Sequence, residues 1–222
     1  TLLRLAAALS LPSSGRIRTP ATFHSARRSS PSPEVSCVFQ RPTLLPWATA
    51  WDNVYLPLRL HGGSRRNARP IVDRALDTVG LSAFADAYPR ELSGGMQMRV
   101  AVARALATAP KAILLDEPFG ALDEITRRQL NDDLLKTWRE SGWAALFVTH
   151  SVTEAVYLST RIEVMATCPG RIVADIAIDL PWPRTEAMRT TPEFNAYCQQ
   201  VSDALHGAMT PSAPHATSPS SI

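Results

Sequence analysis

The sequence predicts an α/β protein built around a mostly parallel sheet. In the second half of the chain, segments with helical periodicity alternate with short apolar segments. This alternation is typical of parallel strands that are joined by helices. Residues 112–115 are four apolar residues in a row. Such an unbroken run indicates a strand buried on both faces, as in a parallel sheet.

The first half of the chain is less regular. Leucines and alanines before Pro12 predict a helix, since proline ends helical periodicity. A region rich in Ser, Pro and Arg then predicts a loop, and a proline-punctuated segment follows Gln40 and continues through Pro57. The predicted elements are a helix at 1–11, a loop at 16–33, a strand at 35–39 and helices at 70–79 and 82–87.

Helix and strand signals are clearer in the second half, where helix N-caps and apolar runs take turns. The predicted elements are a helix at 93–107, a strand at 112–115, a helix at 124–141, a strand at 145–149, a helix at 152–158 and strands at 162–166 and 172–178. The tail at 207–222 is rich in Thr, Pro, Ser and Ala, which predicts disorder. We therefore expect one domain at 1–206.

Composition excludes several classes of protein. The hydrophobic fraction is 45% and the mean hydropathy is −0.06, and no run approaches the roughly 18 apolar residues of a membrane span. The net charge of +3 comes from dispersed arginines, so a nucleic-acid partner is not favoured. Three widely spaced cysteines predict neither a disulfide framework nor a metal site.

Two adjacent carboxylates, Asp116 and Glu117, follow the strand at 112–115. Ligands gather at the carboxyl ends of strands in open α/β sheets, and alternation along a strand sends neighbouring side chains to different faces. One carboxylate can therefore help hold a magnesium ion through water, while the other orients or deprotonates an attacking water. The alternative is a charged pair in an ordinary turn before Pro118.

Three other motifs, at 93–95, 150 and 40, are interpreted from the residues around them. Ser93 is a good helix N-cap, and Gly94 and Gly95 allow backbone N–H groups to approach an anion; the alternative is a plain capped helix. His150 follows the strand at 145–149, and Gln40 ends an apolar pair. Parallel strands would bring both to the edge that carries the two carboxylates, although a lone histidine there is more often structural.

Read in order, these motifs resemble the ABC ATPase family. Gln40 corresponds to the Q-loop, residues 92–95 to the signature motif, Asp116 and Glu117 to Walker B, residues 121–123 to the D-loop and His150 to the H-loop. The resemblance covers about residues 1–204. It implies a P-loop NTPase-like core with a helical subdomain inserted at about 41–107.

The resemblance also implies roles at an ATP site that a head-to-tail dimer of subunits forms. Asp116 would hold Mg²⁺ through water, Glu117 would act as general base and His150 would contact the γ-phosphate. Gln40 would sense that phosphate, touch the metal and link to the transport partner. Thr1 would lie near the α-phosphate.

The opposite subunit completes the site in this family. The resemblance implies that Ser93, Gly94 and Gly95 cap the γ-phosphate bound by the partner, with Asp123 nearby at the interface.

Details resemble importers of the nitrate, sulfonate and taurine kind. The segments at 39–47, 118–123 and 169–173 carry this likeness. It implies two ATPase subunits at the cytoplasmic face of the membrane, bound peripherally to two permease subunits and served indirectly by an external binding protein. Trp47 would lie beside the groove that receives a permease helix; a buried subdomain tryptophan is the alternative.

The phosphate-binding pattern G-x-x-x-x-G-K-[ST] occurs nowhere in the 222 residues. Residues 1–5 resemble the helix that follows this loop in the family, so we expect a chain truncated before or within it, binding MgATP poorly. One alternative is a non-catalytic subunit that acts as a structural or regulatory partner. Another is an ABC-type ATPase of DNA repair or translation, which the absence of coiled-coil heptads disfavours.

The general base gives the first prediction. In a subunit that carries the phosphate-binding loop, Glu117→Gln should abolish ATP turnover and leave MgATP binding intact, because an amide cannot accept the proton of the attacking water. Phosphate release and nucleotide binding measure the two effects separately. Unchanged hydrolysis in the variant would overturn the assignment.

Overall fold

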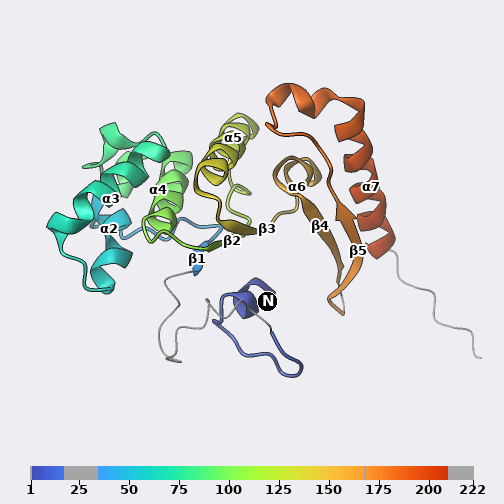
Figure 1. The fold of residues 1–222 in the computed structure, drawn as a ribbon, viewed down its shortest axis with the longest axis horizontal. Coiled ribbons are helices and arrows are strands. Elements are labelled where there is room, and N and C mark those ends of the chain that lie inside the picture. Colours follow the sequence, from blue (N-terminus) through green and yellow to red (C-terminus); the bar gives the residue numbers. More distant parts are fainter. Residues whose placement is uncertain (1, 18–34, 168, 210–222) are drawn as a thin grey trace, which may run out of the picture. The chain divides into compact units, whose positions relative to one another are not determined.

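The structure is a computed structural model and describes residues 2–17, 35–167 and 169–209. It divides into two compact units, Thr1–His150 and Ser151–Ile222, shown along the chain in Figure 1. Thr1 lies outside the described residues, as does the predicted loop at 16–33 apart from Arg16 and Ile17.

A three-stranded parallel sheet forms the centre of the first unit, as the sequence predicts. Its order is β1 (Val35–Val38), β2 (Ala112–Asp116) and β3 (Ala144–Val148). The central strand β2 buries Ile113, Leu114 and Leu115, which explains its unbroken apolar sequence. The third strand starts and ends one residue earlier than predicted.

Strand β3 pairs with β2 alone among the described residues. Its sequence is as apolar as that of β2, yet Leu146 is 39% exposed and Val148 is 36% exposed. Within the described part of the chain, the second edge of β3 therefore has no partner strand, and Leu146 and Val148 are exposed on one face of the strand.

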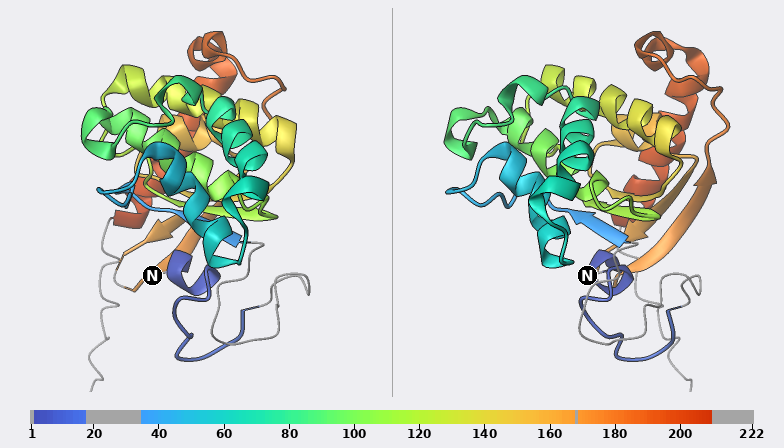
Figure 2. Two further views of the ribbon diagram at one scale, coloured as in Figure 1. Left: turned by 90° about the vertical axis from the view of Figure 1, so that its left-hand side faces the viewer. Right: turned by 60° about the vertical axis from the view of Figure 1, so that its left-hand side comes forward.

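A helical region follows β1 and contains α2 (Ala50–Leu60), α3 (Arg65–Thr78) and α4 (Gly94–Leu106), with 3-10 turns at η2 (Ser82–Phe84) and η3 (Pro89–Glu91). The three helices contact one another pairwise and lie together in Figure 2. Their shared core includes Val54, Val72, Leu76 and Val100, each at most 1% exposed.

The prediction was wrong at two prolines of this helical region, Pro57 and Pro70, which both lie inside helices. The helix α2 was not predicted, because Pro57 suggested a break, yet burial of Trp51, Val54 and Tyr55 stabilises the helix around it. A start at Pro70 was also wrong: the Ser64 side chain accepts a hydrogen bond from the Asn67 N–H, so α3 begins at Arg65. The helix predicted at 82–87 is only a 3-10 turn.

The first helix is shorter than predicted. α1 (Leu2–Ala6) ends well before Pro12, because Ala8 has φ of +56°, a left-handed conformation that interrupts helical hydrogen bonding and costs about 1–2 kcal/mol for a residue with a Cβ.

The long helix α5 (Glu124–Ser141) has the predicted bounds. Asp123 caps its first turn by accepting a hydrogen bond from the Thr126 N–H, and Gly142 ends it with φ of +67°. Both signals are readable in sequence, since aspartate favours N-caps and glycine favours the left-handed position after a helix.

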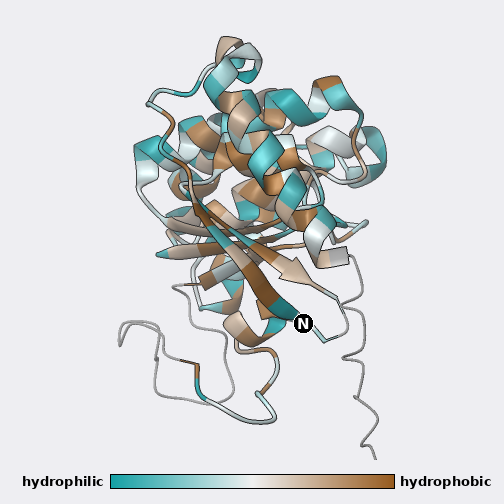
Figure 3. Cartoon of the chain, turned by 90° about the vertical axis from the view of Figure 1, so that its right-hand side faces the viewer, coloured by the Kyte–Doolittle hydropathy of each residue, from teal (hydrophilic) through white to brown (hydrophobic). Residues whose placement is uncertain are grey.

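The second unit contains α6 (Val152–Leu158), β4 (Arg161–Ala166), β5 (Arg171–Ala177), the 3-10 turn η4 (Glu186–Thr190) and α7 (Pro192–Met209). Its two strands pair antiparallel, so the parallel arrangement that the sequence suggested holds only for the first unit; a four-residue connection allows a hairpin and leaves no room for a crossover helix. The helices in Figure 3 alternate between hydrophobic and hydrophilic residues, as amphipathic helices do.

Two features of the second unit escaped prediction. Helix α7 extends to Met209, so residues 207–209 are helical and do not belong to a disordered tail; residues 210–222 lie outside the described part. Arg184 is 7% exposed, and its Nη1 donates to the carbonyl oxygens of Val156, Tyr157 and Ser159. This guanidinium satisfies the carbonyls that the end of α6 leaves open.

Across the described residues, every helix is too short or too polar to cross a bilayer.

Asn53 holds the segment between β1 and α2, and its removal should destabilise the first unit. The side chain is fully buried, accepts from the Leu45 N–H at 2.7 Å and donates to the carbonyls of Leu45, Ala48 and Thr49. Asn53→Ala strands these groups, so we expect a loss of about 2–4 kcal/mol in urea unfolding. Exposed Asn67→Ala is the control and should change stability by less than about 0.5 kcal/mol; equal effects would contradict this account.

Candidate functional site

The parallel register brings three strand ends to one edge of the sheet. Val38 pairs with Leu115, and Asp116 pairs with Val148. Gln40, Glu117 and His150 therefore follow neighbouring strands at the same edge, as the sequence predicts.

Glu117 and His150 are in direct contact. His150 Nε2 lies 2.7 Å from Glu117 Oε1. The histidine side chain is 86% exposed, whereas the glutamate is 27% exposed, so the pair is open to solvent on the histidine side. The Glu117 carboxylate, which can act as a base, and the His150 imidazole, which can form hydrogen bonds, thus lie together where a reactant could reach them.

The backbone at Glu117 is fixed in an uncommon conformation. Its φ is +45°, and its N–H donates to the Val148 carbonyl at 2.9 Å. That hydrogen bond continues the β2–β3 ladder by one residue and offsets part of the left-handed strain. After this strained turn the carboxylate contacts the ring of His150.

Gln40 lies on the other side of the same carboxylate. A Cβ added to Gly120 would lie 3.7 Å from Gln40 Nε2 and 3.7 Å from Glu117 Oε2. Both side chains therefore reach the small surface above Gly120. The structure thus brings Gln40, Glu117 and His150 into one constellation, with Asp116 adjacent in sequence and half-buried.

The protein oxygens here fit a magnesium ion only in part. Within the described ranges, no cluster of three or more His, Cys, Asp or Glu residues could hold a metal ion. Mg²⁺ prefers octahedral oxygen ligands and is commonly held by one or two carboxylates together with substrate phosphates. The carboxylate of Asp116 and the amide oxygen of Gln40 are compatible with that mode of binding.

A second constellation forms where α4 and α5 begin. The Ser93 side chain accepts a hydrogen bond from the Met96 N–H at 3.3 Å and caps α4. A Cβ on Gly94 would lie 3.7 Å from Leu122 Cδ2, and one on Gly95 would lie 2.6 Å from Thr126 Cγ2. Gly95 thus allows the start of α4 to pack closely against the start of α5.

Asp123 has a structural task at this second constellation. Hydrogen bonding from the Thr126 backbone N–H, followed by the Thr126 side chain, lowers the pKa of Asp123. The carboxylate therefore stays charged as a helix cap to lower pH than an ordinary aspartate, and this cap is lost as the pH falls through the lowered pKa. Its additional role at a dimer interface stays a prediction.

Comparison with known proteins identifies the family. The family model described as ABC transporter matches residues 1–120, which include the end of β2 and the start of α4. The chain belongs to the ABC transporter family.

Relatives extend the likeness over most of the chain. A protein of Brucella abortus (strain 2308) named for ATP binding is 46% identical over 209 residues, which is 93% of this chain and 78% of the relative. The nitrate import ATP-binding protein of Synechocystis sp. is 41% identical over 95% of this chain and 80% of the relative. The taurine import ATP-binding protein of Chromobacterium violaceum is 42% identical over 90% of this chain and 77% of the relative.

A solved structure supports the ABC ATPase fold. The ATP-binding cassette MJ0796, in a dimeric post-hydrolysis state bound to ADP and Pi, superposes with a TM-score of 0.67 at 30% identity. The alignment covers 81% of this chain and 80% of that one. The predicted fold class is therefore confirmed, and the chain is an ABC ATPase by family.

Two arginines that hold the site were not predicted. Arg127 Nε donates to the Phe119 carbonyl at 3.3 Å and Arg127 Nη2 to the Leu122 carbonyl at 2.8 Å, which fixes the loop between β2 and α5. Arg104 binds the segment after Gln40. Each arginine lies inside a helix and resembles an ordinary surface charge in sequence, so no local pattern distinguishes it.

The close approach at Gly95 gives a prediction. Gly95→Ala should destabilise the first unit by about 1–3 kcal/mol, because the new methyl overlaps Thr126 Cγ2 and a β-branched side chain in a helix has little room to rotate. Urea unfolding measures the loss.

Neighbouring changes provide the controls. Gly94→Ala meets only ordinary contact and should be neutral or slightly stabilising, since alanine favours helix. Thr126→Ser removes the overlapping methyl and should recover most of the loss in the double variant. If Gly94→Ala and Gly95→Ala cost the same, packing against Thr126 is not the reason for the glycine.

Proposed function

We propose that this chain is the ATP-hydrolysing subunit of an importer of the nitrate, sulfonate and taurine type. The observation that carries the proposal is the Glu117–His150 pair beside Gln40 at the sheet edge. The likeness to nitrate and taurine import ATP-binding proteins, at 41% and 42% identity, supports the transport role.

Glu117 is suited to act on the attacking water. Its carboxylate is partly exposed and lies between Gln40 and His150, so a water there can donate its proton to the glutamate while its oxygen faces the γ-phosphate. The imidazole of His150 contacts this carboxylate through Nε2 in the structure, and with nucleotide bound its ring N–H would donate to the γ-phosphate instead. Phosphoryl transfer depends mainly on such positioning and charge stabilisation.

ATP and Mg²⁺ are the cofactors of this proposal. Asp116 and Gln40 would hold the metal together with the nucleotide phosphates, and the ion would neutralise charge that develops during transfer. Thr1 would lie near the α-phosphate. The phosphate-binding loop pattern occurs nowhere in the 222 residues, so the proposal applies to a subunit that carries this loop.

A second ATPase subunit completes the proposed site. Ser93 and Gly94 are exposed at the start of a capped helix, and the buried Gly95 follows them. The N-terminus of a helix is a geometry that binds anions. In a head-to-tail dimer they would cap the γ-phosphate held by the partner, with Asp123 at the interface. The dimeric state of the solved ADP-bound relative supports this arrangement.

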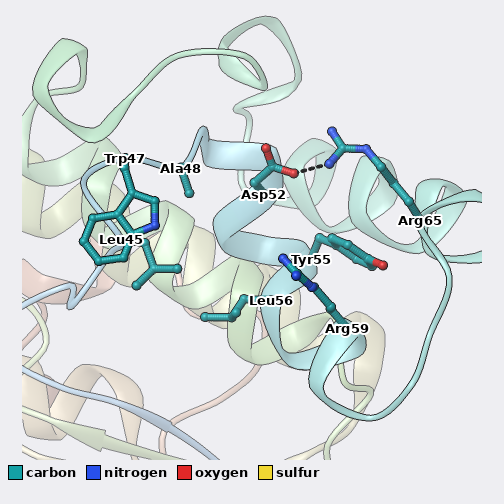
Figure 4. Close-up of a pocket in the computed structure, with 8 residues that line it drawn as sticks. All are labelled: Leu45, Trp47, Ala48, Asp52, Tyr55, Leu56, Arg59 and Arg65. Carbon is teal, nitrogen blue, oxygen red and sulfur yellow. Dashed lines mark hydrogen bonds and ion pairs between the residues drawn. The ribbon is translucent and has the colours of Figure 1, made fainter.

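A pocket in the helical region is the proposed contact with a permease subunit (Figure 4). Its volume is about 290 Å³, and its lining residues are Leu45, Trp47, Ala48, Asp52, Tyr55, Leu56, Arg59 and Arg65. Trp47 is 74% exposed, which is uncommon for so large a side chain and is typical of an interaction site. The subunit would then work peripherally at the cytoplasmic face of the membrane, served by an external binding protein through the permease.

No observation favours the two alternatives. The relatives above are named for import or ATP binding, which supports neither a purely structural subunit nor an ATPase of DNA repair.

The test is ATP hydrolysis by this chain preceded by a Gly-x-x-x-x-Gly-Lys-Ser loop, compared with the chain as it stands. The loop-bearing protein should release phosphate from MgATP at least about tenfold faster than its His150→Ala variant, because removing a group that contacts the transferring phosphate typically costs more than that. The shorter chain should bind MgATP weakly. Equal rates in the loop-bearing protein and the variant would reject the proposed catalytic site.

A further inference from the structure

Arg104, on α4, contacts the segment after Gln40. We infer that Arg104 is a positioning residue, which fixes the segment after Gln40 to α4 so that this segment and the start of α4 move as one body. The inference rests on the proposed function, because it assigns a task to a residue outside the reacting groups.

Three hydrogen bonds connect Arg104 with that segment. Nη1 donates to the Thr43 carbonyl at 2.9 Å, and Nη2 donates to the Pro42 carbonyl at 2.9 Å and to Thr43 Oγ1 at 3.0 Å. A planar guanidinium presents its N–H groups in a fixed fork, whereas a lysine ammonium offers one compact donor centre. Burial lowers the pKa of Arg104, and the same partial exclusion of water strengthens these hydrogen bonds.

The bound segment is strained where Arg104 holds it. Thr43 has φ of +48°, an uncommon conformation for a β-branched residue, which persists only where the surroundings enforce it. Arg104 binds both the carbonyl and the hydroxyl of this same residue. Removing the guanidinium therefore lets the segment relax.

A second contact ties the strand before Gln40 to the same end of α4. Ser36 Oγ lies 2.9 Å from Thr108 Oγ1, and Thr108 Oγ1 donates to the Ala105 carbonyl at 2.9 Å. Gln40 thus lies between two attachments to one short stretch around the end of α4. Farther along, Asn53 holds the Leu45 backbone, so residues 42–45 are fixed at both ends.

The connection matters because of what lies at the other end of α4. This helix of 13 residues begins with Gly94 and Gly95 after its Ser93 cap, and a short helix behaves as a rigid element. Through Arg104, a displacement of the segment after Gln40 would therefore move α4, including the start of this helix that would face the partner subunit.

The experiment compares Arg104→Lys with a matched control on the same helix. Arg99 is also half-buried on α4, and it contacts Asp133 at 2.9 Å and the Val79 carbonyl at 3.4 Å, so Arg99→Lys perturbs the helix without touching the loop. Both variants are made in the loop-bearing chain. Amide hydrogen exchange, kcat, KM for MgATP and the melting temperature are measured.

For Arg104→Lys we expect about tenfold faster exchange at Thr43, Leu44 and Leu45, because the strained segment opens more often. We expect kcat to fall about tenfold while KM for MgATP changes less than about threefold, since a misplaced positioning group affects chemistry more than binding. Arg99→Lys should lower the melting temperature by as much and leave both the exchange at 43–45 and kcat unchanged.

Two outcomes would overturn the inference. One is an equal fall in kcat and melting temperature for both variants, which indicates a merely structural arginine; the other is unchanged exchange at 43–45 in Arg104→Lys. If that variant does not fold, Thr43→Val keeps the shape of the side chain and removes only its hydroxyl, and it should raise exchange at 43–45 about threefold. Absent hydrolysis in the unsubstituted protein rejects the proposed function alone, because the exchange data still decide whether Arg104 holds the loop.

Discussion

The parallel pairing of β1, β2 and β3 is the constraint on which the site depends. Each strand ends at the same edge, and each is followed by a polar side chain of the predicted set. The three side chains come from positions 40, 117 and 150, and only the register makes them neighbours. The strained turn at Glu117, held by its hydrogen bond to Val148, then directs the carboxylate to the histidine.

The sequence predicted the sheet and the candidate site well where chemistry and local signals agree. The unbroken apolar run of β2, the Asp123 cap and Gly142 are strong local signals, and the bounds of α5 follow from them. The convergence of Gln40, Glu117 and His150 followed from one assumption, that their strands are parallel. Roles in nucleotide binding go beyond this geometry and come from the family likeness.

Other features were not predictable because they depend on contacts distant in sequence. Helix α2 persists around Pro57 since its buried aromatic residues outweigh the missing backbone donor. Ala8 and Thr43 adopt left-handed backbone conformations, and neither position is a glycine that would have indicated this in the sequence. Arg104 reaches a segment about sixty residues earlier in the chain, so its importance is visible only once the helix is folded against that segment.

The open edge of β3 has a consequence for intermolecular contacts. An apolar strand with unpaired backbone groups is a template for intermolecular strand addition, and β3 itself, at 144–148, contains no charge or proline that would discourage it. The β3 edges of two copies could pair through backbone hydrogen bonds, or an unrelated extended peptide could add to this edge. Within the described residues, this edge of β3 is therefore the place where a further strand would add to the sheet.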